Sequence, residues 1–336
     1  MIRQSFRADA DQILAVARHL DTVNLPADAG RIARILELSE QSFAGTVPVS
    51  EREYLFVLED LDERRVIGTS MIHAQHGTRR APHVYFAVGK DERYSESLDR
   101  YFVHRCLGIG YDYDGPTEIG GLILLPEYRG HTGGLGRLLS YTRFLFIAMH
   151  RTLFRDRVLS ELLPPLEEDG TSILWEHLGR HFTGLSYQEA DLISKDNKEF
   201  IKSLFPHSRI YTALLPRAVQ QVIGQVGPAT KGVEKMLRRI GFEYAEQIDP
   251  FDGGPHFVAR TEEITLVAGA RRLPAETGGE GGPQWAIVAH EPGGPPNFRA
   301  MAVKLSSPPT ASVRLTAATL DVLGAQPGDP VWVVVS

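Results

Sequence analysis

Residues 119–146 place a glycine-rich, basic loop between an apolar run and a helical pattern, and this arrangement constrains the chain more than any other feature. The small, β-branched and leucyl residues from Ile119 to Leu125 are typical of a buried strand, which ends at Pro126 because proline has no amide hydrogen for the ladder. Glycines before a helix starting near Leu135 let backbone N–H groups approach an anion at the positive helix end. The segment therefore predicts a pyrophosphate site. Its candidate cofactor-binding residues are Leu122, Leu124, Arg129, Gly133, Gly134 and Gly136.

The spacing of these glycines distinguishes several kinds of phosphate loop. Neither G-x-G-x-x-G with a downstream acidic ribose ligand nor G-x-x-x-x-G-K-[ST] occurs here, so dinucleotide and P-loop sites are not expected. An ordinary glycine-rich turn is the plain alternative. An arginine followed by glycine-x-glycine at a helix start resembles the loop of the GCN5-related N-acetyltransferase fold, with a longer spacing between Arg129 and Gly134. The resemblance implies binding of acyl-coenzyme A through its pyrophosphate.

Composition narrows the remaining function classes. A chain of 336 residues exceeds the size that one core usually serves, so two or three domains are expected. A net charge of -6 argues against a nucleic-acid partner. The single cysteine, Cys106, allows no intrachain disulfide and no thiolate metal cluster, and we expect it to be a small buried hydrophobe. No run approaches the ~18 apolar residues of a membrane span and no signal peptide is evident, so we expect a cytoplasmic protein without a membrane partner.

Hydrophobic periodicity predicts a mixed α/β (α+β) fold followed by a small all-β module, and the order of the elements resembles tandem GCN5-related N-acetyltransferase-like units. We expect an acyl-CoA-binding domain over 1–185, a second, shorter acyltransferase-like unit over 186–264 and a β-barrel-like module over 265–336. A helix ending in glycine and an aromatic residue occurs twice, which suggests an internal duplication. Strands are predicted at 54–60, 65–73, 83–89, 157–162, 222–226 and 257–260, and helices at 135–150, 172–182, 231–244 and 316–323.

Several short segments, in the right order along most of the chain, resemble the arginine N-succinyltransferase family. They include NLP at 24–26, FVLED at 56–60, VIGQV at 222–226 and GFEY at 241–244. The most specific is FDGGP at 251–255, because it lies outside the general acyltransferase motif. The resemblance implies succinyl-CoA as a cosubstrate, no permanently bound cofactor, no metal, and L-arginine as the acceptor amine. It also implies a homo-oligomer, with a hetero-oligomer containing a paralogue as the alternative.

The same resemblance shows a departure at the expected proton donor. In that family VIGQV is followed by a histidine regarded as the proton donor, whereas this chain has Gly227. The helix position where related folds carry a donor tyrosine is Trp175, and an indole N–H is no general acid. Our hypothesis is that His256, which directly follows FDGGP, replaces the missing histidine, since histidine ionises near neutral pH. The plain alternative is a half-exposed, inert histidine.

Acidic residues supply the other predicted roles. Glu118 on the phosphate-loop strand is the favoured general base for the α-amine, with Glu161 on the next strand as a second catalytic candidate facing the same cleft. A solvated ion pair is the plain alternative for both. Asp249 and Asp252 are expected to bind the guanidinium group, although Asp-Gly-Gly-Pro is also a common turn. The succinyl carboxylate needs a cation. Arg143 or Arg299 could provide it. The plain alternative is an ordinary arginine on the surface of a helix.

These residues lead to one favoured function and two alternatives. The favoured one is succinyl-CoA:L-arginine N-succinyltransferase in arginine catabolism, by direct attack of the α-amine on the thioester. Gly227 keeps open a non-catalytic paralogue or subunit. The longer phosphate loop, together with Gly227, Pro250 and His256, keeps open an active transferase that uses another amine or acyl donor.

Overall fold

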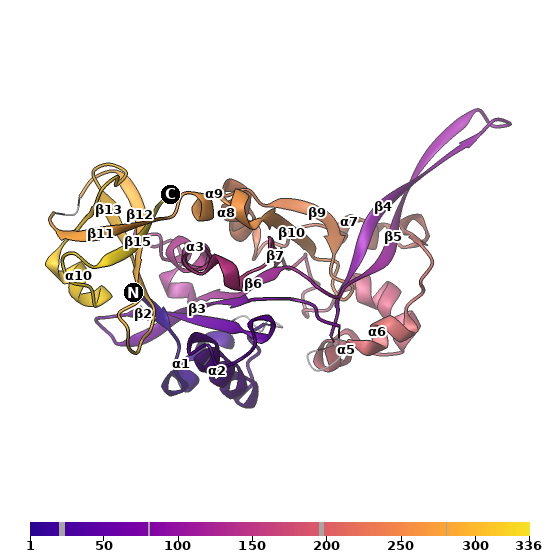
Figure 1. Ribbon diagram of the computed structural model, residues 1–336. Coiled ribbons are helices and arrows are strands. Elements are labelled where there is room, and N and C mark those ends of the chain that lie inside the picture. Colours follow the sequence, from indigo (N-terminus) through magenta and orange to yellow (C-terminus); the bar gives the residue numbers. More distant parts are fainter. Residues whose placement is uncertain (20–23, 80, 195–197, 280) are drawn as a thin grey trace. The chain divides into compact units, whose positions relative to one another are not determined.

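The computed structural model describes residues 1–19, 24–79, 81–194, 198–279 and 281–336 (Figure 1). It has a mixed α/β fold, and its chain separates into two compact units built from interleaved segments. Unit 1 contains Met1–Gln75, Thr117–Asp156 and Arg260–Ser336, and unit 2 contains His76–Pro116 and Arg157–Ala259. Each unit is described by itself. The predicted division into 1–185, 186–264 and 265–336 and the predicted tandem repeat both stay predictions.

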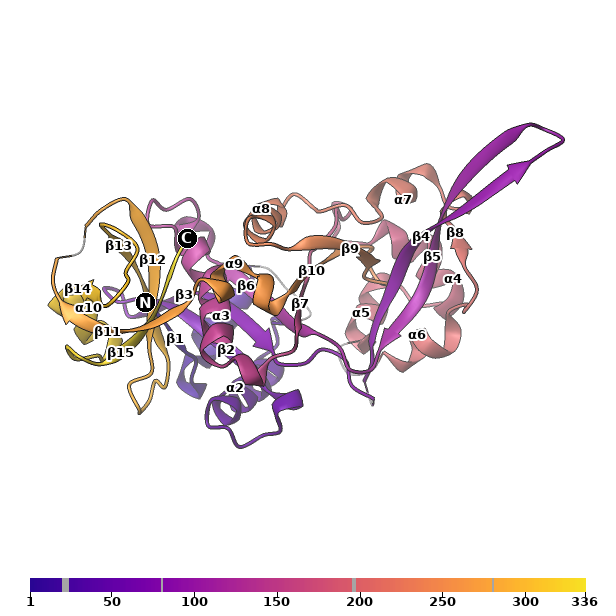
Figure 2. The same ribbon diagram turned by 45° about the horizontal axis from the view of Figure 1, so that its top comes forward.

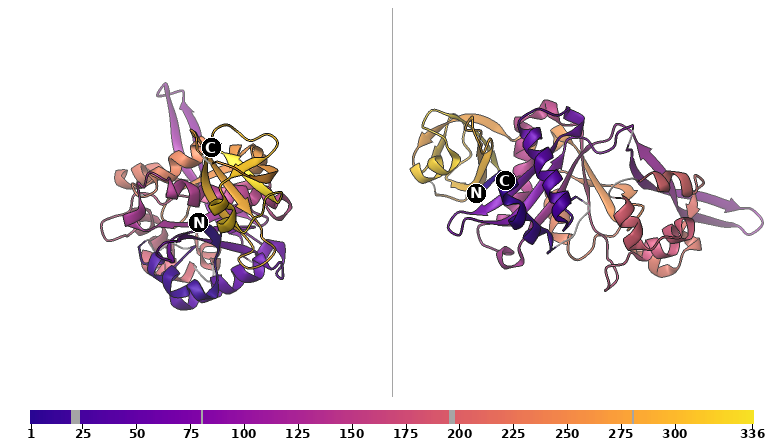
Figure 3. Two further views of the ribbon diagram at one scale, coloured as in Figure 1. Left: turned by 90° about the vertical axis from the view of Figure 1, so that its left-hand side faces the viewer. Right: turned by 90° about the horizontal axis from the view of Figure 1, so that it is seen from below.

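Unit 1 has strands in the order β14-β11-β15-β12-β13-β1-β2-β3-β6. Strand β1 lies between two antiparallel partners, since Ile2 pairs with Leu58 of β2 and with Ala300 of β13. Helices α1 and α2 lie side by side on one face of β2 and β3, and α3 lies on the other (Figures 1 and 3). The bounds are β1 Ile2–Gln4, β2 Glu53–Asp60, β3 Arg65–His73, β6 Thr117–Leu124, α1 Ala10–Ala17, α2 Ala29–Phe43 and α3 Leu135–Met149.

Local chemistry explains why these helices form where they do. The Asp28 side chain caps α2 by accepting a 2.7 Å hydrogen bond from the Arg31 amide, and Ile32 and Leu36 bury one helical face. In α3 the residues from Leu138 to Ile147 are all buried, so this helix has little solvent-facing surface. The predicted hairpin over 54–60 and 65–73 and the predicted helix over 135–150 are confirmed.

The C-terminal part of unit 1 has its own apolar core, which includes Val288, Val303, Leu323 and Val331. Its strands pair antiparallel except β11 and β14, which pair parallel and make the sheet mixed. The predicted short helix near 316–323 is confirmed as α10. The bounds are α9 Thr265–Ala268, β11 Arg271–Thr277, β12 Gln284–His290, β13 Arg299–Leu305, β14 Val313–Leu315, α10 Ala317–Leu323 and β15 Pro330–Val335.

Unit 2 has strands in the order β7-β10-β9-β4-β5-β8. Helices α4, α5 and α6 lie beside the base of the long β4–β5 hairpin (Figure 2), whose far part projects from the unit (Figure 1). Phe86, Leu107, Trp175 and Phe251 belong to the apolar core. The strands are β4 His83–Ser95, β5 Arg100–Asp112, β7 Arg157–Glu161, β8 Ile210–Tyr211, β9 Glu243–Ile248 and β10 Pro255–Arg260. The helices are a π-helix Trp175–Gly179, α4 Arg180–Thr183, α5 Tyr187–Ser194, α6 Glu199–Leu204, α7 Arg217–Val222 and α8 Lys231–Arg239.

One strand prediction in unit 2 is wrong. Residues 222–226 form no strand, because α7 ends at Val222 and the chain then turns through Gly224, which has φ +71°. The apolar residues Val219 and Ile223 are both fully buried and lie four positions apart, which is a helical rather than an extended spacing. Strands β5 and β9 were not predicted. Short 3-10 turns complete the described elements at Arg7–Asp9, Val49–Glu51, Pro126–Tyr128, Arg151–Leu153, Thr212–Leu214 and Thr261–Glu263.

Within the described part of the chain, none of the helices combines the length and the apolar character that crossing a bilayer requires.

Candidate active site

The predicted phosphate loop connects β6 to α3 in unit 1. Gly134 caps the N-terminus of α3 with φ +69°, a left-handed conformation that favours glycine. The first N–H groups of any helix have no partner inside the helix, so those of α3 are available to an anion. Arg129 is exposed, and its Nε donates a 3.0 Å hydrogen bond to the Leu124 carbonyl at the end of β6. These features suit an anion, and a pyrophosphate ligand stays a prediction.

Strand β6 is locally irregular next to this loop. Gly121 has φ +54°, and the β3–β6 pairing shifts register between Thr69 and Met71, as expected for a β-bulge. A bulge bends the strand and re-aims the residues beside it. Leu122 and Leu124 are only partly buried, whereas Ile123 between them is buried, so these two leucines share one side of the strand.

Glu118 is a buried carboxylate on β6, with 2% exposure. It accepts a 2.9 Å hydrogen bond from Asn24 Nδ2, and Asn24 belongs to the NLP segment noted in the sequence. A Cβ at Gly120 would come 1.9 Å from that same Nδ2 atom, so the asparagine needs a glycine there. The role of Glu118 as a base stays a prediction.

Arg143 on α3 is buried, and its guanidinium is bound to unit 1 itself. Its Nε and Nη2 donate to the carbonyl and hydroxyl oxygens of Ser140, and its Nη1 donates to the Gly120 carbonyl at 3.3 Å. Burial lowers its pKa to about 9. These bonds tie α3 to β6. Arg299, the other predicted cation, donates a 3.0 Å hydrogen bond to the Val322 carbonyl. Binding of a succinyl carboxylate by either arginine stays a prediction.

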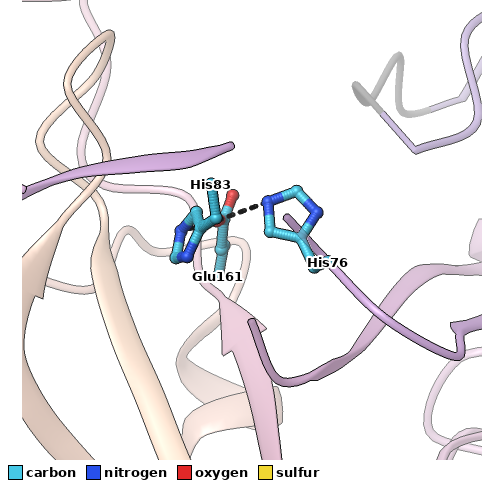
Figure 4. Close-up of side chains that lie close together, drawn as sticks. All are labelled: His76, His83 and Glu161. Carbon is cyan, nitrogen blue, oxygen red and sulfur yellow. Dashed lines mark ion pairs between the residues drawn. The ribbon is translucent and has the colours of Figure 1, made fainter. Parts of the chain in front are cut away.

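A cluster of histidines surrounds one carboxylate in unit 2 (Figure 4). Glu161, the last residue of β7, has its Oε1 atom 3.2 Å from His83 Nε2, 3.5 Å from His256 Nε2 and 3.9 Å from His76 Nε2. His256 is fully buried at the start of β10, and His83 is 2% exposed at the start of β4. The rings of His83 and His256 stack with centroids 5.2 Å apart. We call these four residues the imidazole–carboxylate cluster.

Electrostatics within the cluster favour an ionised carboxylate. Burial opposes ionisation of Glu161, but the neighbouring His256, His83 and His76 outweigh it, so the pKa of Glu161 lies well below its ordinary value. Burial also lowers the pKa of His83, and its contact with Glu161 only partly offsets this. An ionised carboxylate offers only acceptor oxygens, which can fix the position of a neighbouring imidazole N–H.

Asp249 and Asp252 shape the turn between β9 and β10. Asp249 Oδ1 accepts hydrogen bonds from the Phe251 and Asp252 amides, and Asp252 Oδ1 accepts one from Gly254. Burial and repulsion by Glu161 raise the pKa of Asp249 to about 6. Burial and repulsion by Asp249 raise the pKa of Asp252 well above its ordinary value. Both aspartates therefore stabilise a turn, as the alternative interpretation of Asp-Gly-Gly-Pro predicts. A cation would stabilise the ionised forms of the two carboxylates.

The structure brings some predicted residues together and adds others. His256, Glu161 and Asp249 come from separate parts of the sequence, yet their ligand atoms all lie within 4.8 Å of one another. Glu118 and the phosphate loop belong to unit 1, so the predicted common cleft of Glu118 and Glu161 stays a prediction. His76 and His83 were not predicted as site residues. Their segment, rich in arginine, glycine and proline, has no regular spacing that would have pointed to them.

Comparisons with known proteins indicate one family along nearly the whole chain. The family model "Arginine N-succinyltransferase beta subunit" matches residues 1–266, and the model of the C-terminal domain of that same beta subunit matches residues 271–334. The chain is 34% identical to arginine N-succinyltransferase from Enterobacter sp. (strain 638) over 93% of this chain and 90% of that protein. It is 33% identical to the enzyme of the same name from Escherichia coli O6:K15:H31 (strain 536 / UPEC), over 99% and 97%.

A solved structure of similar sequence also matches this chain along nearly its whole length. It is described as arginine/ornithine succinyltransferase subunit AI from Pseudomonas aeruginosa, and it superposes with a TM-score of 0.86 at 31% identity. The superposition covers 99% of this chain and 98% of that one.

Proposed function

The chain belongs to the arginine N-succinyltransferase family, and from this premise we propose that it transfers the succinyl group of succinyl-CoA to the α-amine of L-arginine. The amine nitrogen attacks the thioester carbon, the carbon–sulfur bond breaks, and the products are N-succinylarginine and coenzyme A. Attack is direct, without a covalent enzyme intermediate. Binding of the coenzyme A pyrophosphate is assigned to Arg129 and the N-terminus of α3, because an exposed arginine adjoins a helix end that begins at a left-handed glycine.

The observation that carries the mechanism is the 3.5 Å approach of His256 Nε2 to Glu161 Oε1 in a fully buried position. An inert histidine at a strand start would be expected to be partly exposed, whereas this ring is fully buried and lies 3.5 Å from a carboxylate. We assign His256 the role of protonating the departing thiolate and Glu161 the role of orienting His256. A thiolate is a moderately good leaving group, so loss of the acid would be tolerable even though a general acid typically contributes about 10²–10⁴ in rate.

We assign removal of the amine proton to Glu118, which is buried on β6 and held by Asn24. Its fixed position would suit proton transfer, which requires the base within hydrogen-bond reach of the amine. Asp249 and Asp252 are assigned to the guanidinium group. Burial is the main cause of their raised pKa values, and repulsion between neighbouring carboxylates adds to it; a planar cation with several N–H donors would offset both.

A second candidate is ornithine as the acceptor, favoured by the description of the solved relative as an arginine/ornithine succinyltransferase. An ammonium group could also approach Asp249 and Asp252, but it lacks the planar fork of guanidinium. The test is thiol release from succinyl-CoA with L-arginine or L-ornithine, with acetyl-CoA as donor control and mass detection of the product. Arginine-dependent release supports the proposal. Binding of succinyl-CoA without release from any pair contradicts it and favours a non-catalytic subunit.

We also propose a cytoplasmic homo-oligomer. The β4–β5 hairpin supports the oligomer, because its far part exposes Tyr94, Leu98, Tyr101 and Phe102 at 50% or more. Light scattering on the wild type and on a Tyr101→Ser/Phe102→Ser variant would test this. A monomeric wild type would contradict it, and mixed species formed with a co-expressed paralogue would favour the hetero-oligomer.

A further inference from the structure

We propose that His76, His83 and Glu161 form a binding site for one divalent transition-metal ion of the zinc type. The three side chains come from the segment before β4, from the first residue of β4 and from the last residue of β7. They offer one ligand atom each, and these atoms all lie within 4.8 Å of one another. In Figure 4 the His76 ring and the Glu161 carboxylate face each other beside His83.

The distances around Glu161 Oε1 are close to those between the ligands of a tetrahedral metal ion. Bonds of about 2.0–2.1 Å at tetrahedral angles put neighbouring ligand atoms roughly 3.3 Å apart. The observed separations from Oε1 are 3.2 Å to His83 Nε2 and 3.9 Å to His76 Nε2. A distance of 3.9 Å is too long for a hydrogen bond. His76 is 24% exposed, so a small movement of this less constrained ring would complete the site.

The chemistry of the ligand set indicates which metals would bind. Two imidazoles and one carboxylate match the ligands of zinc, cobalt and nickel, whereas calcium and magnesium prefer sites made of oxygen atoms alone. Ligands must also be in their deprotonated forms. Three protein ligands would leave one tetrahedral position open.

A second set of ligand atoms lies next to the first and gives a competing location. Glu161, Asp249 and His256 also place their ligand atoms within 4.8 Å of one another. We favour the His76 set because it contains two imidazoles, and because nitrogen ligands bind zinc-type ions more strongly than the mixed carboxylate set would. Variants of Asp249 and His256 therefore serve to decide between the two locations.

The experiment measures metal binding directly on the full-length protein without an affinity tag, after chelation and dialysis. Isothermal titration with zinc chloride and the visible absorption of added Co²⁺ report stoichiometry, affinity and coordination. The expected result is one equivalent per chain, a tetrahedral Co²⁺ spectrum and a higher melting temperature with zinc. His76→Ala, His83→Gln and Glu161→Gln should each weaken zinc binding by at least about tenfold.

The matched control is His177→Ala, which removes an exposed histidine of the same unit and should leave zinc affinity unchanged. Zinc binding that survives His76→Ala and His83→Gln but disappears in Asp249→Asn or His256→Gln would overturn the proposal and place the ion in the second set. Equal zinc affinity in the wild type and all three ligand variants would also overturn it. If His83→Gln fails to fold, the partly exposed His76 still gives the decisive comparison. None of these measurements depends on acyl transfer. Failure of the metal-site proposal can therefore be distinguished from failure of the proposed function.

Discussion

Gly227 lies against the main chain of Pro164, so that a Cβ added at Gly227 would come 2.4 Å from the Pro164 carbonyl oxygen. The Gly227 amide also donates a 2.8 Å hydrogen bond to the Leu163 carbonyl. The segment after β7 therefore fills the space that a side chain would need. A histidine in this slot would require that backbone to move. That His256, on β10, replaces it stays a prediction.

Gly227→Ala is expected to destabilise the fold by about 2–3 kcal/mol, because the clash is with backbone atoms rather than with a flexible side chain. The matched control is Gly232→Ala in α8, where an added Cβ meets nothing within 4 Å and should stabilise the helix by up to about 1 kcal/mol. Urea unfolding of both variants measures the difference. A Gly227→Ala protein as stable as the wild type would show that the segment at 163–164 yields easily.

The phosphate-loop elements could be predicted from sequence because their signals are local. An apolar run, a proline, a group of glycines and a helical stripe fixed β6 and α3 to within a few residues. The error at 222–226 arose because two valines and an isoleucine read as a strand, whereas burial of Val219 and Ile223 on one helical side decided the structure. His76 and His83 could not be predicted, because only the pairing of β4, β9, β10 and β7 brings them to Glu161.

His256→Gln is expected to lower kcat for succinyl transfer by about 10²–10⁴ while changing KM little, since a general acid acts on the transition state. His177→Gln, at an exposed position, is the control and should retain the wild-type rate. Steady-state kinetics with L-arginine and succinyl-CoA measure both. An unchanged kcat in His256→Gln would exclude His256 as the donor.

Glu118→Gln should keep the hydrogen bond from Asn24, since a glutamine oxygen also accepts, but it removes the base. We expect kcat to fall by about 10²–10⁴, with a melting temperature close to that of the wild type. Glu127→Gln, which changes an exposed carboxylate after β6, is the control. A fully active Glu118→Gln enzyme would exclude Glu118 as the base.

Asp249→Asn is expected to stabilise the free protein at neutral pH. The pKa of Asp249 in the folded protein is about 6, which lies above the ordinary value of 3.8. The protonated carboxyl therefore contributes to the free energy of unfolding below about pH 4, and this contribution is lost as the pH rises through about 6. Asparagine cannot ionise but still accepts from the Phe251 and Asp252 amides. Relative to the wild type, the free energy of unfolding of the variant should increase by about zero at about pH 4 and by on the order of 1–3 kcal/mol at about pH 7. Thermal melts at several pH values measure this difference.

The control for this variant is Asp62→Asn in the exposed turn between β2 and β3, which should show no such pH-dependent gain. Asp249→Asn should also raise KM for arginine, because one carboxylate facing the guanidinium is lost. If Asp249→Asn is more stable but has an unchanged KM for arginine, Asp249 does not bind the substrate.

Arg129→Gln should raise KM for succinyl-CoA by about 10-fold or more, since hydrogen bonds to charged groups contribute about 1.5–3 kcal/mol. Stability should change little, because the side chain is exposed and makes one bond to the Leu124 carbonyl. The effect should shrink at high salt, where charge attraction is screened. Arg65→Gln, another exposed arginine of unit 1, is the control, and equal KM values for both variants would argue against a phosphate contact.

The pairing of β1 with both β2 and β13 has a consequence for synthesis of the protein. Strand β1 is synthesised well before β13, whose Ala300 pairs with Ile2. Until β13 has been made, one side of β1 is an open strand edge, and the sheet of unit 1 stays incomplete. A protein shortened before β13 would keep that edge permanently, so it is expected to aggregate rather than yield a separate acyltransferase domain.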